Sequence, residues 1–134
     1  LRPDVVFGAD IIAGFPTETE AMFARSLDIV DECGVTHLHV FPFSLRPGTP
    51  AARMPQVPRE MVKDRARRLR EKAAVALRRH LDGEVGHIRS VLIERGGIAR
   101  TAQFTPVRLG GGAPVGSIVD VSISAHDGRH LIAA

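Results

Sequence analysis

The stretch that most constrains the fold is residues 10–18, Asp-Ile-Ile-Ala-Gly-Phe-Pro-Thr-Glu. It reads as an apolar strand that stops at Gly14, turns through Pro16 and opens a helix at Thr17, where Thr17 and Glu20 have the spacing of a capping box. This strand–turn–helix order is typical of a βα unit of a parallel sheet. A glycine at the carboxyl end of such a strand either lets a ligand approach the backbone or simply allows the chain to turn. Both interpretations remain open.

The helix is expected to run to about Cys33, because Gly34 is a natural terminator, and a second strand is expected over residues 36–41. Alternation sends Leu38 and Val40 toward the covering helices. The opposite face then combines polar and aromatic residues of both strands, namely Asp10, Ile12, His39 and Phe41. Inward polar residues near strand ends are where βα barrels keep their chemistry, although His39 is equally interpreted as a buried, hydrogen-bonded core histidine.

Composition excludes several protein classes. The chain has 134 residues, 44% of them hydrophobic and 25% charged, which suits a globular protein with one core or two small ones. No apolar run approaches the roughly 20 residues of a membrane span, so we expect a cytoplasmic protein without a membrane partner. The single cysteine, Cys33, excludes an internal disulfide framework and any all-cysteine metal site within the chain. We expect it to be a core residue at a helix end rather than a reactive thiol.

Positive charge is concentrated in a predicted helix over residues 58–80, which has nine basic and three acidic residues. An apolar stripe along this helix is bordered on both sides by arginines and lysines, and we expect their charged groups to lie outside. They either extend over a packed helix or form a phosphate-contacting face. Before the helix, a proline-rich loop over residues 42–50 is expected to be ordered, with Arg46 as its only charge, suited to a carboxylate or phosphate.

Beyond residues 81–84 the pattern changes to short strands, expected at 85–94, 98–109 and 118–124 and divided by glycines. Strands of this spacing predict a small β-barrel or OB-like module. The run Gly110-Gly111-Gly112 is expected to form a hairpin, because no Lys-Ser/Thr pair or helix follows it as in a phosphate loop.

Two long motifs suggest a family. Residues 8–20 read Gly-Ala-Asp-Ile-Ile-Ala-Gly-Phe-Pro-Thr-Glu-Thr-Glu, and residues 37–51 read His-Leu-His-Val-Phe-Pro-Phe-Ser-Leu-Arg-Pro-Gly-Thr-Pro-Ala. In this order they resemble the fifth and sixth barrel strands of radical S-adenosylmethionine tRNA methylthiotransferases. Thr17 stands where glycine is commoner in that family. Residues from about 84 onward resemble its RNA-binding TRAM domain.

The resemblance implies an α/β + β fold class. Residues 1–82 are expected to form the last two βα units of a radical SAM barrel, a partial TIM barrel, including the basic helix over 58–80. Residues 83–134 are expected to form a small OB-like TRAM β-barrel. The family's two iron–sulfur clusters each need three cysteines, so their ligands are expected upstream of this chain, in another half of the same polypeptide.

The implied function is transfer of a methylthio group to the adenine ring of threonylcarbamoyladenosine in tRNA, next to the anticodon. S-adenosylmethionine and the clusters would be the cofactors, and this chain alone would be inactive and hold no metal. The isopentenyladenosine-modifying branch and a stand-alone RNA-binding module remain alternatives. The residues expected at the cofactor are Asp10, Ile12, Gly14, Pro16, His39 and Phe41. Those expected at RNA are Arg46, Lys63, Arg67, Arg70, Arg100, Thr101, Gln103 and Phe104, where Phe104 either stacks on a base or belongs to the core.

Overall fold

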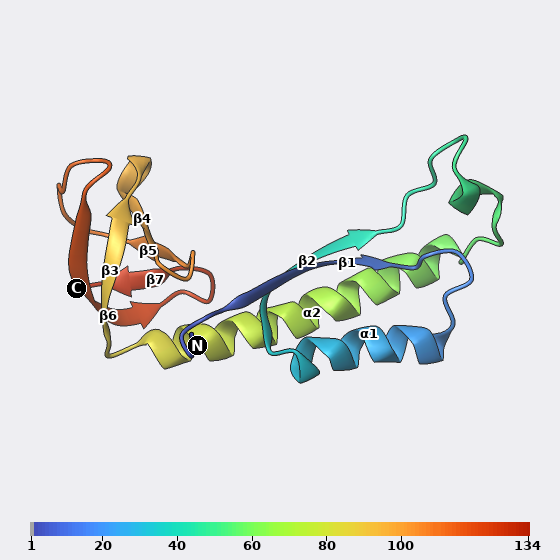
Figure 1. Cartoon of the computed structure of the whole chain (residues 1–134), viewed down its shortest axis with the longest axis horizontal. Coiled ribbons are helices and arrows are strands. Elements are labelled where there is room, and N and C mark those ends of the chain that lie inside the picture. Colours follow the sequence, from blue (N-terminus) through green and yellow to red (C-terminus); the bar gives the residue numbers. More distant parts are fainter. Residues whose placement is uncertain (1) are drawn as a thin grey trace. The chain divides into compact units, whose positions relative to one another are not determined.

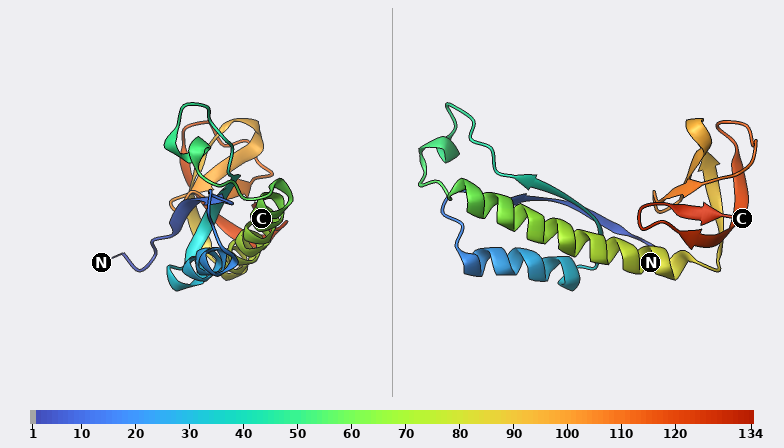
Figure 2. Two further views of the ribbon diagram at one scale, coloured as in Figure 1. Left: turned by 90° about the vertical axis from the view of Figure 1, so that its right-hand side faces the viewer. Right: turned by 180° about the vertical axis from the view of Figure 1, so that it is seen from behind.

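A computed structural model describes residues 2–134 (Figures 1 and 2). Contacts divide the chain into two compact units. Val6–Ala76 forms one, called here the βα unit. Leu77–Ala134 forms the other, together with the described residues up to Val5, and is called the barrel unit. Among the described residues, no helix is both long and apolar enough to cross a membrane.

The βα unit consists of two parallel strands covered by helices on one face (Figures 1 and 2). Strand β1 spans Phe7–Ala13, helix α1 Glu20–Glu32 and strand β2 Val35–Pro42. A 3-10 turn, η1, follows at Pro50–Arg53, and helix α2 runs over Arg59–Glu84, so its first part belongs to this unit. The core consists of Ala13, Phe23, Ala66 and Leu69, packed with Ile11, Leu27, Leu38 and Val40.

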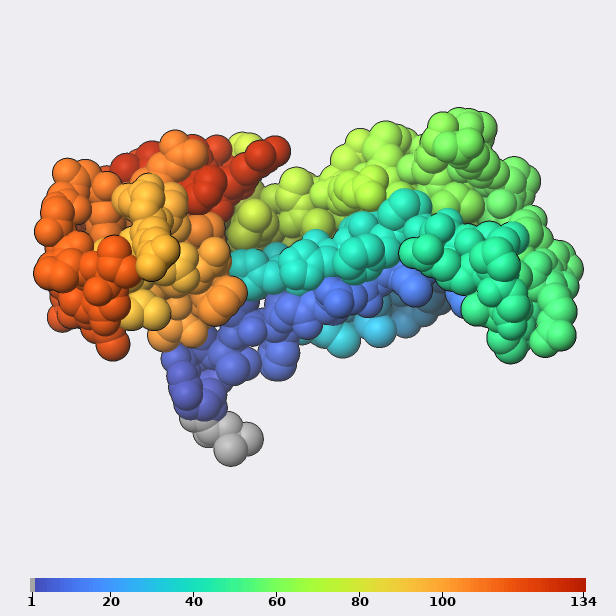
Figure 3. Space-filling model, turned by 90° about the horizontal axis from the view of Figure 1, so that it is seen from above, coloured from blue at the N-terminus to red at the C-terminus, as the bar shows by residue number. Residues whose placement is uncertain are grey.

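The predicted division of the two strand faces is confirmed. Leu38 and Val40 pack on the helices with Ile11 and Ala13, because period-2 alternation places them on the same side. The other face of β1 and β2 lies at the surface (Figure 3). Its exposed side chains are Asp10, Ile12, His39 and Phe41.

The start and end of α1 differ from the prediction. Thr19, not Thr17, is the N-cap, and its side-chain oxygen accepts a hydrogen bond from the backbone N–H of Met22 at 3.2 Å. Thr17 instead adopts a left-handed conformation with φ of 69° in the turn before the helix, where its N–H donates to the Pro55 carbonyl. Cys33 caps the other end and is exposed, so the expectation of a core cysteine is wrong.

Helix α2 continues four residues beyond its predicted end, to Glu84. The reason is packing: Leu81 is fully buried in the core of the barrel unit, and Leu77 packs against the same core. Residues 81–84, where the sequence pattern was expected to change from helix to strand, therefore form the last turn of α2.

The barrel unit is a closed barrel with strand order β3-β4-β5-β7-β6, in which β5 and β7 are parallel. Its elements are β3 (Ile88–Ile93), η2 (Arg95–Gly97), β4 (Ile98–Thr101), β5 (Pro106–Arg108), β6 (Ile118–His126) and β7 (Leu131–Ala133). Its core comprises Leu81, Val91, Ile93, Ala99, Val107, Ile123 and Leu131. This confirms the predicted small β-barrel and is compatible with a TRAM-like module.

Two details of the barrel prediction are wrong. The strand expected over residues 98–109 is two antiparallel strands, β4 and β5, because the chain turns at residues 102–105. The run Gly110-Gly111-Gly112 lies in the connection from β5 to β6, and these strands are not neighbours, so it is a crossover rather than a hairpin.

Candidate cofactor and RNA-binding sites

A pocket of about 430 Å³ lies in the βα unit, at the carboxyl ends of the two parallel strands. Its lining residues are Ile12, Phe41, Pro42, Phe43, Ser44, Arg46, Thr49 and Ala51. In open parallel sheets this end is where ligands bind. Two residues predicted at the cofactor, Ile12 and Phe41, meet there because they are register partners on adjacent strands. Arg46, predicted at RNA, is the only charged residue of the lining.

Asp10 and His39 are also register partners, and Asp10 Oδ1 lies 3.0 Å from His39 Nδ1. Both side chains are exposed, so the interpretation of His39 as a buried histidine is wrong. Because an ionised carboxylate only accepts hydrogen bonds, Nδ1–H of His39 is the donor of this pair. Both residues were expected on one face, but their pairing was not predicted, because it depends on the register of the two strands.

Gly14 and Pro16 are buried in the turn that follows β1. Gly14 has a φ of 76°, and a Cβ atom built there would lie 2.6 Å from a methyl group of Val62. Packing of α2 against the turn therefore requires glycine at this position. The structure gives a packing reason for Gly14 that needs no ligand.

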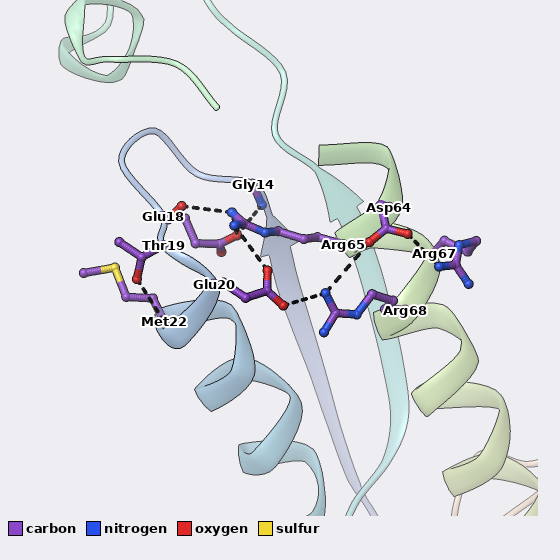
Figure 4. Close-up of polar contacts among 9 residues, drawn as sticks. All are labelled: Gly14, Glu18, Thr19, Glu20, Met22, Asp64, Arg65, Arg67 and Arg68. Atoms are coloured by element: carbon purple, nitrogen blue, oxygen red, sulfur yellow. Dashed lines mark hydrogen bonds and ion pairs between the residues drawn. The ribbon is translucent and has the colours of Figure 1, made fainter. Parts of the chain in front are cut away.

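A buried ion pair holds the same turn (Figure 4). The Arg65 guanidinium, with a side chain only 2% exposed, donates to Glu18 Oε1 at 2.8 Å and to the Glu18 carbonyl at 2.9 Å. Glu18 Oε1 also accepts from the Gly14 N–H at 3.1 Å. Next to this pair, Arg68 donates to Glu20 Oε1 and its guanidinium lies over the Phe23 ring.

The basic helix uses much of its charge within the chain. Arg65 is buried, which contradicts the expectation that the charged groups on both sides of the apolar stripe lie outside. Arg67 donates to Asp64 and to Glu71, both at 2.6 Å, and these hydrogen bonds raise the pKa of its guanidinium. Lys63 pairs with Glu60, whereas Arg70 reaches only the carbonyl of Val40, at 3.4 Å.

On the barrel, Phe104 is 72% exposed, so its alternative as a core residue is wrong. The Arg100 guanidinium lies 4.7 Å from the centre of its ring, and Glu94 binds Arg100 at 3.0 Å. Phe104 lies in the turn between β4 and β5 with a φ of 66°. The other two predicted residues serve the fold: Thr101 is buried and accepts from the Thr105 N–H, and Gln103 donates to the Asp4 carbonyl.

The chain's residues do not fit an iron–sulfur cluster, because each cluster needs three thiolates and Cys33 is the only cysteine. No group of three potential metal ligands occurs within residues 2–134. The pocket at the strand ends does fit part of a nucleoside cofactor: its size lies in the range of small-molecule sites and its walls are mostly apolar.

Sequence comparison gives three informative relatives. A threonylcarbamoyladenosine tRNA methylthiotransferase of Rickettsia prowazekii is 48% identical over 118 residues, 88% of this chain. The corresponding enzyme of Thermotoga maritima is 44% identical over 95 residues, 70% of the chain. A tRNA-2-methylthio-N(6)-dimethylallyladenosine synthase of Erythrobacter litoralis is 38% identical over 134 residues, 91% of the chain.

The chain belongs to the tRNA methylthiotransferase family. It spans 28%, 22% and 29% of the lengths of the Rickettsia, Thermotoga and Erythrobacter proteins. No protein-family profile matches it. Radical S-adenosylmethionine chemistry and iron–sulfur clusters are general features of this family, and relatives acting on both kinds of modified adenosine match the chain.

Proposed function

We propose that this chain is the C-terminal part of a methylthiotransferase that acts on threonylcarbamoyladenosine in tRNA. The observation that supports the proposal is the apolar pocket at the strand ends. Its lining comes from the two sequence motifs, residues 8–20 and 37–51, on which the family resemblance rests. The Rickettsia relative is named for this reaction. At similar coverage of the chain, 88% and 91%, the identity is higher to the Rickettsia protein than to the Erythrobacter synthase, which favours the threonylcarbamoyladenosine branch. Residues 1–82 would complete a radical SAM barrel and residues 83–134 would be its TRAM domain.

In this proposal Ile12 and Phe41 hold the adenosyl group of S-adenosylmethionine. Both side chains are about half exposed on the open face of the sheet, so a bound adenine ring would cover apolar surface that now faces water. Asp10 and His39 lie on the same face, and their hydrogen bond fixes the imidazole for contact with a ribose hydroxyl or ring nitrogen. Buried Gly14 and Pro16 act indirectly by shaping the turn.

When bound, the cofactor supplies a radical for substitution at the adenine ring, after reduction by a cluster whose ligands lie outside this chain. The chain's own contribution is binding, orientation and exclusion of water. We expect it alone to be inactive. Anaerobic reconstitution followed by iron analysis and visible absorbance tests this, and a stoichiometric cluster on the chain would contradict it.

The barrel unit would bind tRNA through Phe104 and Arg100. An exposed aromatic ring with a guanidinium stacked on it is a surface on which an unpaired base can stack, at about 1–3 kcal/mol per base. Changing Phe104 to Ala is expected to weaken tRNA binding about 5- to 150-fold with little change in its salt dependence, measured by filter binding. The fold should survive because the ring is mostly exposed.

The cofactor proposal is tested by calorimetric binding of S-adenosylhomocysteine to the longer polypeptide that carries this chain. Phe41→Ala is expected to weaken binding at least about fivefold through lost stacking. Phe7→Ala is the matched control, since Phe7 is equally exposed in the same sheet but does not line the pocket. Equal effects of both variants would count against a cofactor site here. Mass spectrometry of nucleosides after turnover on each modified tRNA distinguishes the two branches.

A stand-alone RNA-binding module is the second candidate, favoured by the exposed Phe104–Arg100 stack. It predicts tRNA binding by this chain and no calorimetric signal with S-adenosylhomocysteine.

A further inference from the structure

Most cations of the βα unit fall into two groups, and Arg70, which reaches only the Val40 carbonyl, belongs to neither. Those on the part of α2 that belongs to this unit are mostly neutralised by carboxylates of the same unit. The pairs are Lys63–Glu60, Arg65–Glu18, Arg65–Glu20, Arg67–Asp64, Arg67–Glu71, Arg68–Glu20, Arg68–Asp64 and Lys72–Asp31. Each phosphate that approached these cations would have to displace a carboxylate.

The second group lies in the connection before α2 and at the first residue of that helix, Arg59. Within the described part of this unit, no ion pair joins Arg46, Arg53 or Arg59 to a carboxylate, and all three side chains are exposed. Residues 33–59 contain these three arginines and neither an aspartate nor a glutamate. The connection from β2 to the first turn of α2, residues 43–59, is called here the arginine loop. It carries uncompensated positive charge.

The arginine loop is held in place by its own hydrogen bonds. The Thr49 hydroxyl donates to the Arg46 carbonyl at 2.8 Å, and the Gln56 side chain donates to the carbonyls of Ala51 and Met54 at 2.9 and 2.8 Å. At its start, the Phe43 N–H donates to the Ala13 carbonyl at 2.8 Å. A loop ordered before binding loses little conformational entropy when it meets a ligand.

One end of the loop forms a wall of the pocket. Arg46 lines the pocket together with Phe41 and Phe43. Phe41 lies near the end of β2, and Phe43 is the first residue of the arginine loop. Phe43 is supported from behind by an edge-on contact with Phe15 at 5.5 Å between ring centres. Since Phe41 is assigned to the adenosyl group, Arg46 beside the Phe43 ring is the combination that suits an unpaired nucleotide, with its phosphate on the guanidinium.

We propose that the arginine loop contacts the phosphates of single-stranded RNA, with Arg46 holding the backbone of the nucleotide presented to the pocket. This inference rests on the proposed function, since it takes tRNA as the substrate. It places the RNA contacts of the βα unit on Arg46, Arg53 and Arg59 rather than on the paired cations Lys63 and Arg67. The anticodon loop, which is single-stranded, is the part of tRNA that such a surface fits.

The test is filter binding of an anticodon stem–loop RNA to the chain at several salt concentrations. Each phosphate contact in a single strand contributes about 0.7 to the slope of log affinity against log salt. The variant R46Q/R53Q/R59Q is expected to flatten the slope by about 2. The matched control K63Q/R67Q/R68Q removes the same number of positive charges and is expected to flatten it by less than 1. Circular dichroism verifies that both variants are folded.

The outcomes separate the two proposals. If the control flattens the slope more than the loop variant, the helix face carries the contacts and the inference is wrong, while tRNA binding stands. If the loop variant keeps the parent slope but Arg46→Gln weakens S-adenosylhomocysteine binding to the longer polypeptide, Arg46 holds a cofactor carboxylate and the inference is again wrong. If the parent chain does not bind the RNA, both proposals fall.

Discussion

Replacing Arg65 with Met tests the buried ion pair that holds the turn after β1. Arg65 and Glu18 have side chains only 2% and 10% exposed, so the substitution leaves a carboxylate in a largely water-excluded place. Removing one partner of a buried pair typically costs about 3–5 kcal/mol, because the remaining charge is uncompensated. We therefore expect Arg65→Met to lower the free energy of unfolding by about this amount, a large share of the total stability of a small domain.

Arg68→Met is the matched control, three residues along the same helix. Its partner Glu20, which also lies 3.5 Å from Arg65, is 59% exposed and Arg68 itself 34%, so this pair is screened by water and is expected to contribute only about 0.2–1 kcal/mol. Urea unfolding followed by circular dichroism in the helical region measures both variants, and the chain has no Trp or Tyr for intrinsic fluorescence.

A double variant, R65M with E18Q, removes both charges and should recover part of the loss. If Arg65→Met costs no more than Arg68→Met, the buried pair does not stabilise the turn and the reasoning is refuted.

Three further outcomes are expected. Gly14→Ala should destabilise the βα unit by more than about 1 kcal/mol, because φ is 76° and the new Cβ meets Val62; adding Val62→Ala should restore only part of the loss in the same urea assay. Leu81→Ala should cost about 2–5 kcal/mol in barrel stability, since the side chain is fully buried, and a melt unchanged by this variant would show that α2 does not contribute to the barrel core. Backbone N–H donors in the β6–β7 turn lower the pKa of Asp127 to about 2, so stability present above pH 4 should decline as the pH falls toward 2, and Asp127→Asn should melt with a flatter pH profile in that window.

The sequence predicted the strand faces of the βα unit well, because alternation is a local property. Apolar Leu38 and Val40 had to face the helices, and Asp10 and His39 followed to the opposite side. Their hydrogen bond was not predicted, since it depends on the register of two strands whose partner residues are 29 positions apart.

Helix ends were less predictable where tertiary contacts determine the residue at which a helix begins or ends. Two threonines compete to start α1, and local spacing favours Thr17. The structure selects Thr19, because the turn places the Thr17 N–H against the Pro55 carbonyl in a left-handed conformation. Leu81 was predicted to lie beyond the end of the basic helix. In the structure α2 includes it, because Leu81 packs into the barrel core, and this contact cannot be read from the local sequence.

The ion pairs of the basic helix were also only partly predictable from the sequence. The sequence located the basic helix but not the pairing of its cations. Arg67 meets carboxylates at i−3 and i+4, which helical spacing alone would have suggested, whereas the burial of Arg65 depends on a glutamate 47 residues earlier. The residues predicted at cofactor and RNA remain predictions until binding is measured.

The two-stranded sheet has a consequence for the solution behaviour of the chain. In contrast to the closed barrel, β1 and β2 each pair on one side only, so their outer edges present unmatched backbone donors and acceptors. Such an edge is a template that accepts any strand of suitable length, from the same polypeptide or from another copy. A tethered strand reaches an effective concentration in the millimolar range, about a thousandfold above a copy at micromolar concentration. Covalent continuity with further strands would therefore protect this sheet kinetically from self-association.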